Sequence, residues 1–219
     1  MTLHVRNMES IVGPFVDGAY SVSASSAYVG VVNPSNGNRF MRIPEGCESD
    51  INLAVSATRR AFEDGRWNDV PPSVRKRTLH LLEDLLEAHA QTLDSLGAEV
   101  MGKPLSLERR NASSAARQIR CYAEAVDKGS SDVYVSYRTS LVVQQRVPRG
   151  IVAAIVPWSF PTSYAVLRLA PALATGNCVV LKPSELSSRS AIYLAQLAGE
   201  AGLPSRRFRC GAGVGRDSG

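Results

Sequence analysis

The chain has 219 residues, of which 44% are hydrophobic and 21% are charged, and its formal net charge is +5. This composition is typical of a soluble globular protein and excludes a low-complexity or disordered chain. The basic residues are spread over predicted helices in pairs such as Arg59-Arg60 and Arg109-Arg110, which indicates solvated faces rather than nucleic-acid binding. The longest apolar region, 164–181, contains Arg168 and Pro171, so we expect no membrane span.

The cysteines do not form a metal-binding or disulfide pattern. Four lie far apart in the sequence without a CxxC pair: Cys47, Cys121, Cys178 and Cys210. This spacing predicts neither a zinc site nor a disulfide framework, so we expect no metal and a reducing, cytoplasmic location. The polar N-terminus, with only a short and broken apolar run, does not indicate a signal peptide.

Strands and turns are predicted over residues 10–45, and three helices follow. The first is expected to begin at Ser49 or Asp50 and to be ended by Gly65. A second begins at Pro71-Pro72, and its leucine stripe runs on to Leu96. The third is predicted from Pro104 to about Gly129. Alternating apolar residues in 132–147, around an Arg-Thr-Ser turn, then predict a two-stranded hairpin.

The next stretch predicts an α/β crossover. Ile151–Val156 and Cys178–Leu181 are short apolar runs typical of buried parallel strands. Between them, Thr162–Thr175 has apolar residues at helical spacing and is closed by Gly176-Asn177. Strand, helix and strand in this order form a right-handed unit of a parallel sheet. A further helix is predicted from Ser188 to Ala201.

A short group of polar or bulky residues follows each of the two predicted strands. Pro157-Trp158-Ser159-Phe160-Pro161 follows the first, and Lys182-Pro183-Ser184-Glu185 follows the second. Open α/β sheets bind their ligands at the carboxyl ends of the strands. Glu185 could accept the ribose hydroxyls of a dinucleotide, with Lys182 as a charged donor beside it. The alternative is a generic crossover without a site, because the glycine-rich turn of the usual dinucleotide fingerprint is missing.

Three linked motifs carry a family resemblance. PWSFP, PALATGNCVVLKPSE and EAGLP resemble, in order and spacing, the PWNFP, PALAAGN, KPSE and AGLP motifs of the aldehyde dehydrogenase superfamily. The resemblance covers the whole chain, which would end at Gly219 roughly midway through a family member of usual length. Ser159 stands where the family has asparagine.

The resemblance implies an incomplete Rossmann-like parallel sheet with flanking helices, an N-terminal strand region and a protruding β-hairpin. Residues 1–131 would be the N-terminal strands and helical part of the cofactor-binding domain, and 148–219 the first part of its sheet. Residues 132–147 would be an oligomerisation hairpin that pairs with a neighbouring subunit. The alternative is a hairpin packed on its own chain.

The resemblance also implies the residues of a cofactor site for NAD, with NADP possible. The positions that match the family's contacts are Ile155, Val156, Pro157, Trp158, Lys182, Pro183, Ser184 and Glu185, with Gly215 and Gly219 near the adenine and diphosphate. The implied activity is oxidation of a small-molecule aldehyde to a carboxylic acid. Ser159 would occupy the oxyanion-hole position, where its shorter side chain offers one donor; it also fits a simple turn serine.

The catalytic cysteine and glutamate of the family have no counterpart in this chain, so we expect the chain alone to be inactive. None of the four cysteines lies in a sequence typical of a reactive thiolate. Two other interpretations stay open: a truncated nucleotide-binding or subunit-interaction module without catalysis, and a fragment that does not fold stably.

A third strand is expected near 205–211, but three arginines interrupt it: Arg206, Arg207 and Arg209. Buried, unpaired arginines are incompatible with the middle of a parallel sheet. A local frame shift in the coding sequence would explain the change, and an exposed basic loop is the alternative.

Overall fold

A computed structural model describes residues 15–16, 19–20, 23–137, 140–203 and 208–210. Its largest sheet has the strand order β2-β1-β9-β8-β7. Three of these strands are parallel: β7 (Ile151–Ile155), β8 (Cys178–Lys182) and β9 (Phe208–Cys210). The short strands β1 (Phe15–Val16) and β2 (Ala19–Tyr20) extend the sheet in antiparallel fashion. The predicted α/β class with a parallel sheet is therefore confirmed.

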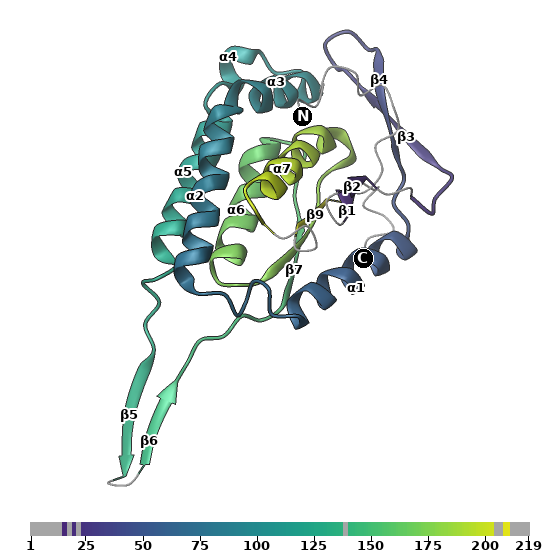
Figure 1. Cartoon of the computed structure of the whole chain (residues 1–219). Coiled ribbons are helices and arrows are strands. Elements are labelled where there is room, and N and C mark those ends of the chain that lie inside the picture. The colour runs from purple at the N-terminus through teal and green to yellow at the C-terminus, as the bar shows by residue number, and fades with distance from the viewer. Residues whose placement is uncertain (1–14, 17–18, 21–22, 138–139, 204–207, 211–219) are drawn as a thin grey trace.

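Helices cover this sheet in layers (Figure 1). The helix of the predicted crossover, α6 (Pro161–Ala174), packs on β7 and β8, and α7 (Ser188–Glu200) lies beside it. An outer layer consists of α2 (Pro72–Ala88) and α5 (Asn111–Ala125), while α1 (Glu48–Glu63) contacts β7 and β8 on the other side. Because Cys178 and Val179 point to opposite faces of β8 and are both fully buried, this strand is covered on both faces.

The core lies between the sheet and α6, where alanine and leucine side chains allow close packing. Ala165, Leu169 and Leu173 of α6 are fully buried, as are Ala112 and Ile119 of α5. Trp67 closes this core from the loop before α2, and its indole Nε1 donates a 3.0 Å hydrogen bond to the carbonyl of Leu173.

Two of the predicted helices are interrupted, which corrects their expected bounds. The second ends at Ala88, and a new helix, α3 (Ala90–Met101), begins after His89. The third divides into a short α4 (Leu105–Glu108) and α5, because Arg110 has a left-handed backbone with φ of 80°. The first begins at Glu48, with Cys47 as its cap, rather than at Ser49 or Asp50.

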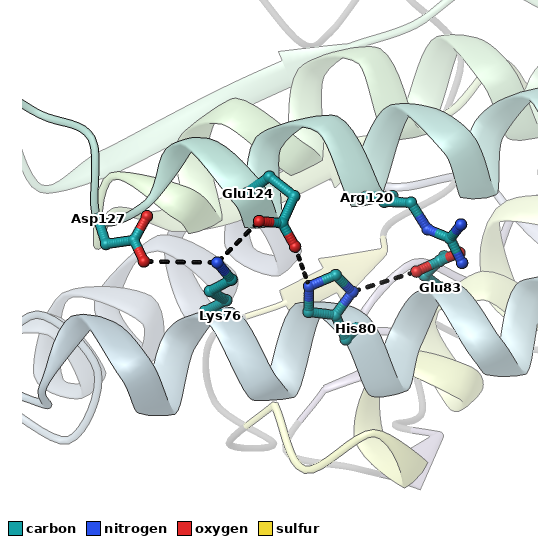
Figure 2. A network of polar contacts seen from close by, with 6 residues as sticks. All are labelled: Lys76, His80, Glu83, Arg120, Glu124 and Asp127. Atoms are coloured by element: carbon teal, nitrogen blue, oxygen red, sulfur yellow. Dashed lines mark hydrogen bonds and ion pairs between the residues drawn. The ribbon is translucent and has the colours of Figure 1, made fainter.

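Charged side chains join α2 to α5 (Figure 2). Glu124 of α5 accepts hydrogen bonds from Lys76 Nζ at 2.8 Å and contacts His80 Nε2 at 2.9 Å. His80 Nδ1 lies 3.2 Å from the buried carboxylate of Glu83, which also pairs with Arg120. The network ties together the two helices of the outer layer near the end of α5, where the hairpin begins.

The hairpin of β5 (Asp132–Tyr137) and β6 (Ser140–Gln144) projects away from the body of the molecule (Figure 1). Apolar side chains on both strands are exposed, among them Val133, Leu141 and Val143. This arrangement does not support the alternative in which the hairpin packs on its own chain. A second, separate pair of strands, β3 (Tyr28–Val32) and β4 (Arg39–Pro44), confirms the strands expected in 10–45.

The expected third parallel strand forms in spite of the arginines. The backbone of β9 pairs with β8, with Phe208 opposite Val179 and Cys210 opposite Leu181. The alternative of an exposed basic loop is therefore wrong for residues 208–210. Arg206 and Arg207 lie outside the described residues, as do Gly215 and Gly219.

Candidate functional site at the carboxyl ends of the strands

The two clusters predicted from the sequence lie together at the carboxyl ends of the parallel strands, which form one edge of the sheet. In the parallel pair, Ile155 is in register with Lys182, the last residue of β8. One residue further, the N–H of Val156 donates a 3.1 Å hydrogen bond to the carbonyl of Lys182. Trp158 and Glu185 thus follow adjacent strand ends, where α/β sheets bind their ligands.

The turn after β7 presents apolar surface at this edge. Ile155 is 66% exposed and Trp158 is 49% exposed, whereas Val156 between them is buried. Pro157 is exposed and Ser159 is half-buried. Large exposed apolar side chains beside a strand end form a surface against which a flat apolar ligand can pack.

The turn ends with a strained residue. Phe160 has φ of 49° and ψ of 58°, a left-handed conformation that aromatic residues rarely adopt. Its carbonyl accepts a 3.0 Å hydrogen bond from Tyr164 N, and Pro161 follows as the first residue of α6. Proline is favourable there because the first turn of a helix does not need its N–H.

The turn after β8 is held by serine hydrogen bonds. The hydroxyl of Ser184 accepts from the N–H of Leu186 at 3.3 Å, and the carbonyl of Ser184 accepts from Ser188 Oγ at 2.9 Å. These bonds start a 3₁₀ turn, η2 (Glu185–Ser187), which leads into α7. Pro183 is buried, while Lys182 and Glu185 are half-buried. Both residues therefore keep part of their surface open to solvent beside these strand ends.

A buried polar cluster behind this edge was not predicted from the sequence. It consists of Lys103, Glu108, Asn111 and Ser163. Glu108 is fully buried, and its Oε1 accepts a 2.7 Å hydrogen bond from Asn111 Nδ2. Lys103 Nζ lies 3.7 Å from Glu108 Oε2 and 3.3 Å from the centre of the Phe160 ring. In the sequence, Lys103 lies in a Gly-Lys-Pro segment between two helices. Such a segment does not predict the contacts of Lys103 with Glu108 and Phe160.

Burial and neighbouring groups shift the pKa values of the buried carboxyl groups in opposite directions. Burial raises the pKa of Glu108, whereas the hydrogen bond from Asn111 and the charge of Lys103 lower it. Burial also raises the pKa of Asp94, although its carboxylate accepts from the backbone N–H groups of Arg110 and Ala112. Asp94 thereby caps the start of α5 and supports the left-handed Arg110.

Cys178 and Cys121 lie away from the strand-end site, whereas the backbone of Cys210 ends β9 in register with Leu181. Cys178 is buried at the first residue of β8, which is the opposite end of that strand, and Cys121 is exposed on α5. Cys47 caps α1. Within the described part of the chain, no group of three or more His, Cys, Asp and Glu side chains is arranged to hold a metal ion. No helix in that part combines the length and apolarity needed to span a membrane.

This geometry defines a class of protein: an α/β fold in which PWSFP and KPSE turns follow adjacent parallel strands. Comparison with known proteins identifies the family. A model of the aldehyde dehydrogenase family matches residues 21–219. The chain belongs to the aldehyde dehydrogenase family, as the motifs indicated.

Relatives of known sequence agree with this assignment. The chain is 43% identical over 206 residues to the NADP/NAD-dependent aldehyde dehydrogenase PuuC of Escherichia coli (strain K12), covering 94% of this chain and 42% of that protein. It is 37% identical over 211 residues to the phenylacetaldehyde dehydrogenase of Pseudomonas fluorescens, covering 93% and 42%. The chain therefore spans about 42% of the length of these relatives.

Solved structures show the same arrangement. An indole-3-acetaldehyde dehydrogenase in complex with NAD+ superposes with a TM-score of 0.91 at 37% identity, covering 96% of this chain and 43% of that one. The aldehyde dehydrogenase KauB from Pseudomonas aeruginosa superposes with a TM-score of 0.90 at 40% identity, covering 93% and 41%.

Proposed function

We propose that this chain supplies the nucleotide-binding portion of an NAD(P)-dependent aldehyde dehydrogenase, which oxidises an aldehyde to a carboxylic acid. The observation that supports this proposal most directly is the register of Ile155 with Lys182, because it brings the PWSFP and KPSE turns to one edge of the sheet. The family membership agrees with it, and so do the cofactors of two similar proteins, NADP or NAD for PuuC and NAD+ in the indole-3-acetaldehyde dehydrogenase complex.

The residues at the edge fit the adenosine half of the cofactor. Ile155, Pro157 and Trp158 offer exposed apolar surface for a flat ring, with Val156 buried behind them. The Glu185 carboxylate would accept ribose hydroxyls, and Lys182 would donate to the same sugar or its phosphates. Pro183 and Ser184 hold the backbone between these two side chains. When bound, the cofactor supplies the hydride acceptor for aldehyde oxidation.

The remaining site residues stay predictions. Ser159 occupies the turn position at which the family has asparagine, and its hydroxyl would be the one donor offered to a developing oxyanion. Gly215 and Gly219 lie outside the described residues. The division into 1–131, 132–147 and 148–219 is likewise a prediction about the domains. A cytoplasmic location is likewise a proposal, and it rests on the spacing of the cysteines in the sequence, which lacks a CxxC pair or a disulfide framework.

Titration of the purified 219-residue chain with NAD, followed by calorimetry and by the fluorescence of Trp158, tests the proposal. We expect saturable binding, and Glu185→Gln should weaken it. Glu63→Gln, which removes the same charge from an exposed position at the end of α1, is the matched control. Absence of saturable binding up to millimolar NAD would contradict the nucleotide-binding proposal.

Catalysis by this chain alone is not expected. An aldehyde dehydrogenase needs a reactive thiolate in an open, electropositive position. Cys178 is buried at the far end of β8, and Cys121 lies on the outer helix α5. A panel of aldehydes with NAD should therefore give no turnover. If NAD binds and no aldehyde is oxidised, the chain acts in isolation as a nucleotide-binding module.

A second proposal concerns the hairpin. Its exposed apolar residues favour pairing with the same segment or another edge in a second copy of the chain, which would make the protein a homo-oligomer. Val133 is 59% exposed and Leu141 is 67% exposed. Light scattering should show that Leu141→Lys lowers the oligomeric state. Leu107→Lys, at a 70% exposed leucine of α4, is the control and should leave it unchanged.

A further inference from the structure

The backbone of Phe160 is strained. This residue is the last of the exposed turn and the cap of α6, and its φ of 49° is unfavourable for a bulky side chain. Such a conformation persists only where surrounding contacts hold it. The contacts that hold Phe160 therefore also hold Trp158 and Ser159, which precede it in the same turn.

Lys103 provides the most direct contact. It follows Gly102, whose left-handed φ of 65° ends α3. The ammonium of Lys103 lies 3.3 Å from the centre of the Phe160 ring, well within the range of a cation–π interaction. Its Nζ is buried and has no hydrogen bond to any residue that the structure describes. The ring face and the Glu108 carboxylate at 3.7 Å are the groups that compensate its charge.

Glu108 is the second group that holds the ammonium of Lys103. Its Oε2 is buried and, in the described part of the chain, makes no hydrogen bond, so this oxygen depends on Lys103 for compensation. Gly97 of α3 packs so closely that a Cβ there would lie 2.7 Å from Glu108 Oε1. The carboxylate consequently has little freedom to move, and a rigid carboxylate holds the lysine against the ring.

The same cluster also contacts the first turn of α6, which directly follows the Pro157–Pro161 turn. Asn111, which donates to Glu108, is joined to Ser163 in the first turn of α6, where Ser163 Oγ donates to the Asn111 carbonyl at 3.2 Å. Ser163 also contacts Asn111 Oδ1. Both the ring of Phe160 and the helix that begins after it are thus tied to the α4–α5 connection.

We infer that Lys103 is a positioning residue for the nucleotide edge, which acts by holding Phe160, and through it the Pro157–Pro161 turn, in the conformation that presents Trp158 to the cofactor. The inference rests on the proposed function of this edge. Lys103 does not itself need to touch the nucleotide. Its contribution is made before binding, because it keeps the turn in one conformation.

Two measurements on the 219-residue chain test this inference. Acrylamide quenching without nucleotide reports on Trp158, because Trp67, the other tryptophan, is buried. Lys103→Met should raise the quenching of Trp158 and weaken NAD binding by about 3- to 30-fold, the range that corresponds to a partly buried cation–π contact. Lys103→Arg keeps a cation that can lie on the ring and should recover most of both losses.

Further variants separate positioning from stability. In a Phe160→Leu background, Lys103→Met should have no additional effect on quenching or on NAD affinity, because the partner ring is gone. Lys103→Met with Glu108→Gln avoids an unpaired buried carboxylate, and it replaces the single variant if that one does not fold. Lys128→Met, at an exposed lysine after α5, is the control for the lost charge.

The inference is overturned if Lys103→Met lowers the melting temperature but matches Lys128→Met in both quenching and NAD affinity. Lys103 would then only stabilise the fold. If the wild-type chain does not bind NAD, the proposed function fails, and the quenching comparison alone still decides whether Lys103 positions the turn.

Discussion

The side-chain oxygen of Asn177 accepts a 2.8 Å hydrogen bond from the backbone N–H of Gly150. The two residues immediately precede β8 and β7, so this bond joins the starts of the two strands at the end opposite the candidate site. Asn177 also donates from Nδ2 to Thr175 Oγ1 at 2.8 Å. Its position sets how far the two parallel strands are displaced along each other, and therefore how their carboxyl ends line up.

Removal of this hydrogen bond should destabilise the protein without changing any residue of the candidate site. Asn177→Ala leaves the buried N–H of Gly150 without a partner, which typically costs about 1–3 kcal/mol. Urea denaturation should show this loss in the free energy of unfolding. Asn38→Ala, at an exposed turn residue, should change it by no more than about 0.5 kcal/mol. Equal effects of the two variants would contradict the assigned role of Asn177.

Two glycines inside helices should respond to alanine in opposite directions. At Gly97 of α3 the new Cβ would lie 2.7 Å from Glu108 Oε1, whereas at Gly199 of α7 no atom lies within 4 Å. Gly199→Ala should stabilise the chain by about 0.5–1 kcal/mol, because alanine is the better helix former. Gly97→Ala should destabilise it in spite of the same gain. Thermal denaturation compares the pair, and a stabilising Gly97→Ala would show that Glu108 is free to move.

The network of Figure 2 predicts an acid-dependent contribution to stability. Hydrogen bonds from Lys76 and then His80 hold the pKa of Glu124 below its ordinary value of 4.5. A carboxyl group with a lowered pKa stabilises the folded state above its unfolded pKa, and this contribution is lost as the pH falls through the folded pKa. Glu124→Gln should therefore be less stable than the wild type at neutral pH, and the difference should shrink below about pH 4.5.

Denaturation at a series of pH values measures this difference. Glu200→Gln removes a carboxylate from the exposed end of α7, where it makes no contact with the α2–α5 network, and serves as the control. A difference between wild type and Glu124→Gln that stays constant from pH 7 to pH 3 would contradict the proposed linkage.

Cofactor preference should depend on the charges after β8. In the proposed site the Glu185 carboxylate would repel the 2′-phosphate of NADP, and two unit charges about 4 Å apart in water interact by about 1 kcal/mol. Glu185→Gln should therefore raise the affinity for NADP relative to NAD by about five- to tenfold. Lys182→Met should shift the ratio the other way. Calorimetric titration with both nucleotides measures the ratio, and an unchanged ratio in both variants would place the 2′ position elsewhere.

Much of the region around the site could be predicted from local pattern. The strand at 151–156, the helix at 162–175 and the strand at 178–181 each agree with the structure to within a residue or so. These elements have continuous apolar runs or clear helical spacing, with Pro161 at the start of the helix and Gly176 just beyond its end. Both signals are local, because each reflects the backbone preferences of the residue itself.

Other features depended on residues distant in sequence. The break at His89 cannot be read from the leucine stripe that runs through it; its ring instead contacts the Tyr193 hydroxyl of α7 at 2.7 Å. The break before α5 depends on Asp94, which accepts from Arg110 N and Ala112 N across the α3–α5 connection. Lys103 and Phe160 likewise meet only in the folded chain. Helical periodicity carries no information about such contacts.

The position of β7 has a practical consequence. Among the strands that the structure describes, β7 pairs with β8 alone, so half of its backbone N–H and C=O groups face outward beside Ala153 and Ile155, which are exposed. Such a border is a template on which a strand of another molecule can add. Concentrated samples of this chain should therefore associate through β7, and a lysine at Ala153 should keep them dispersed.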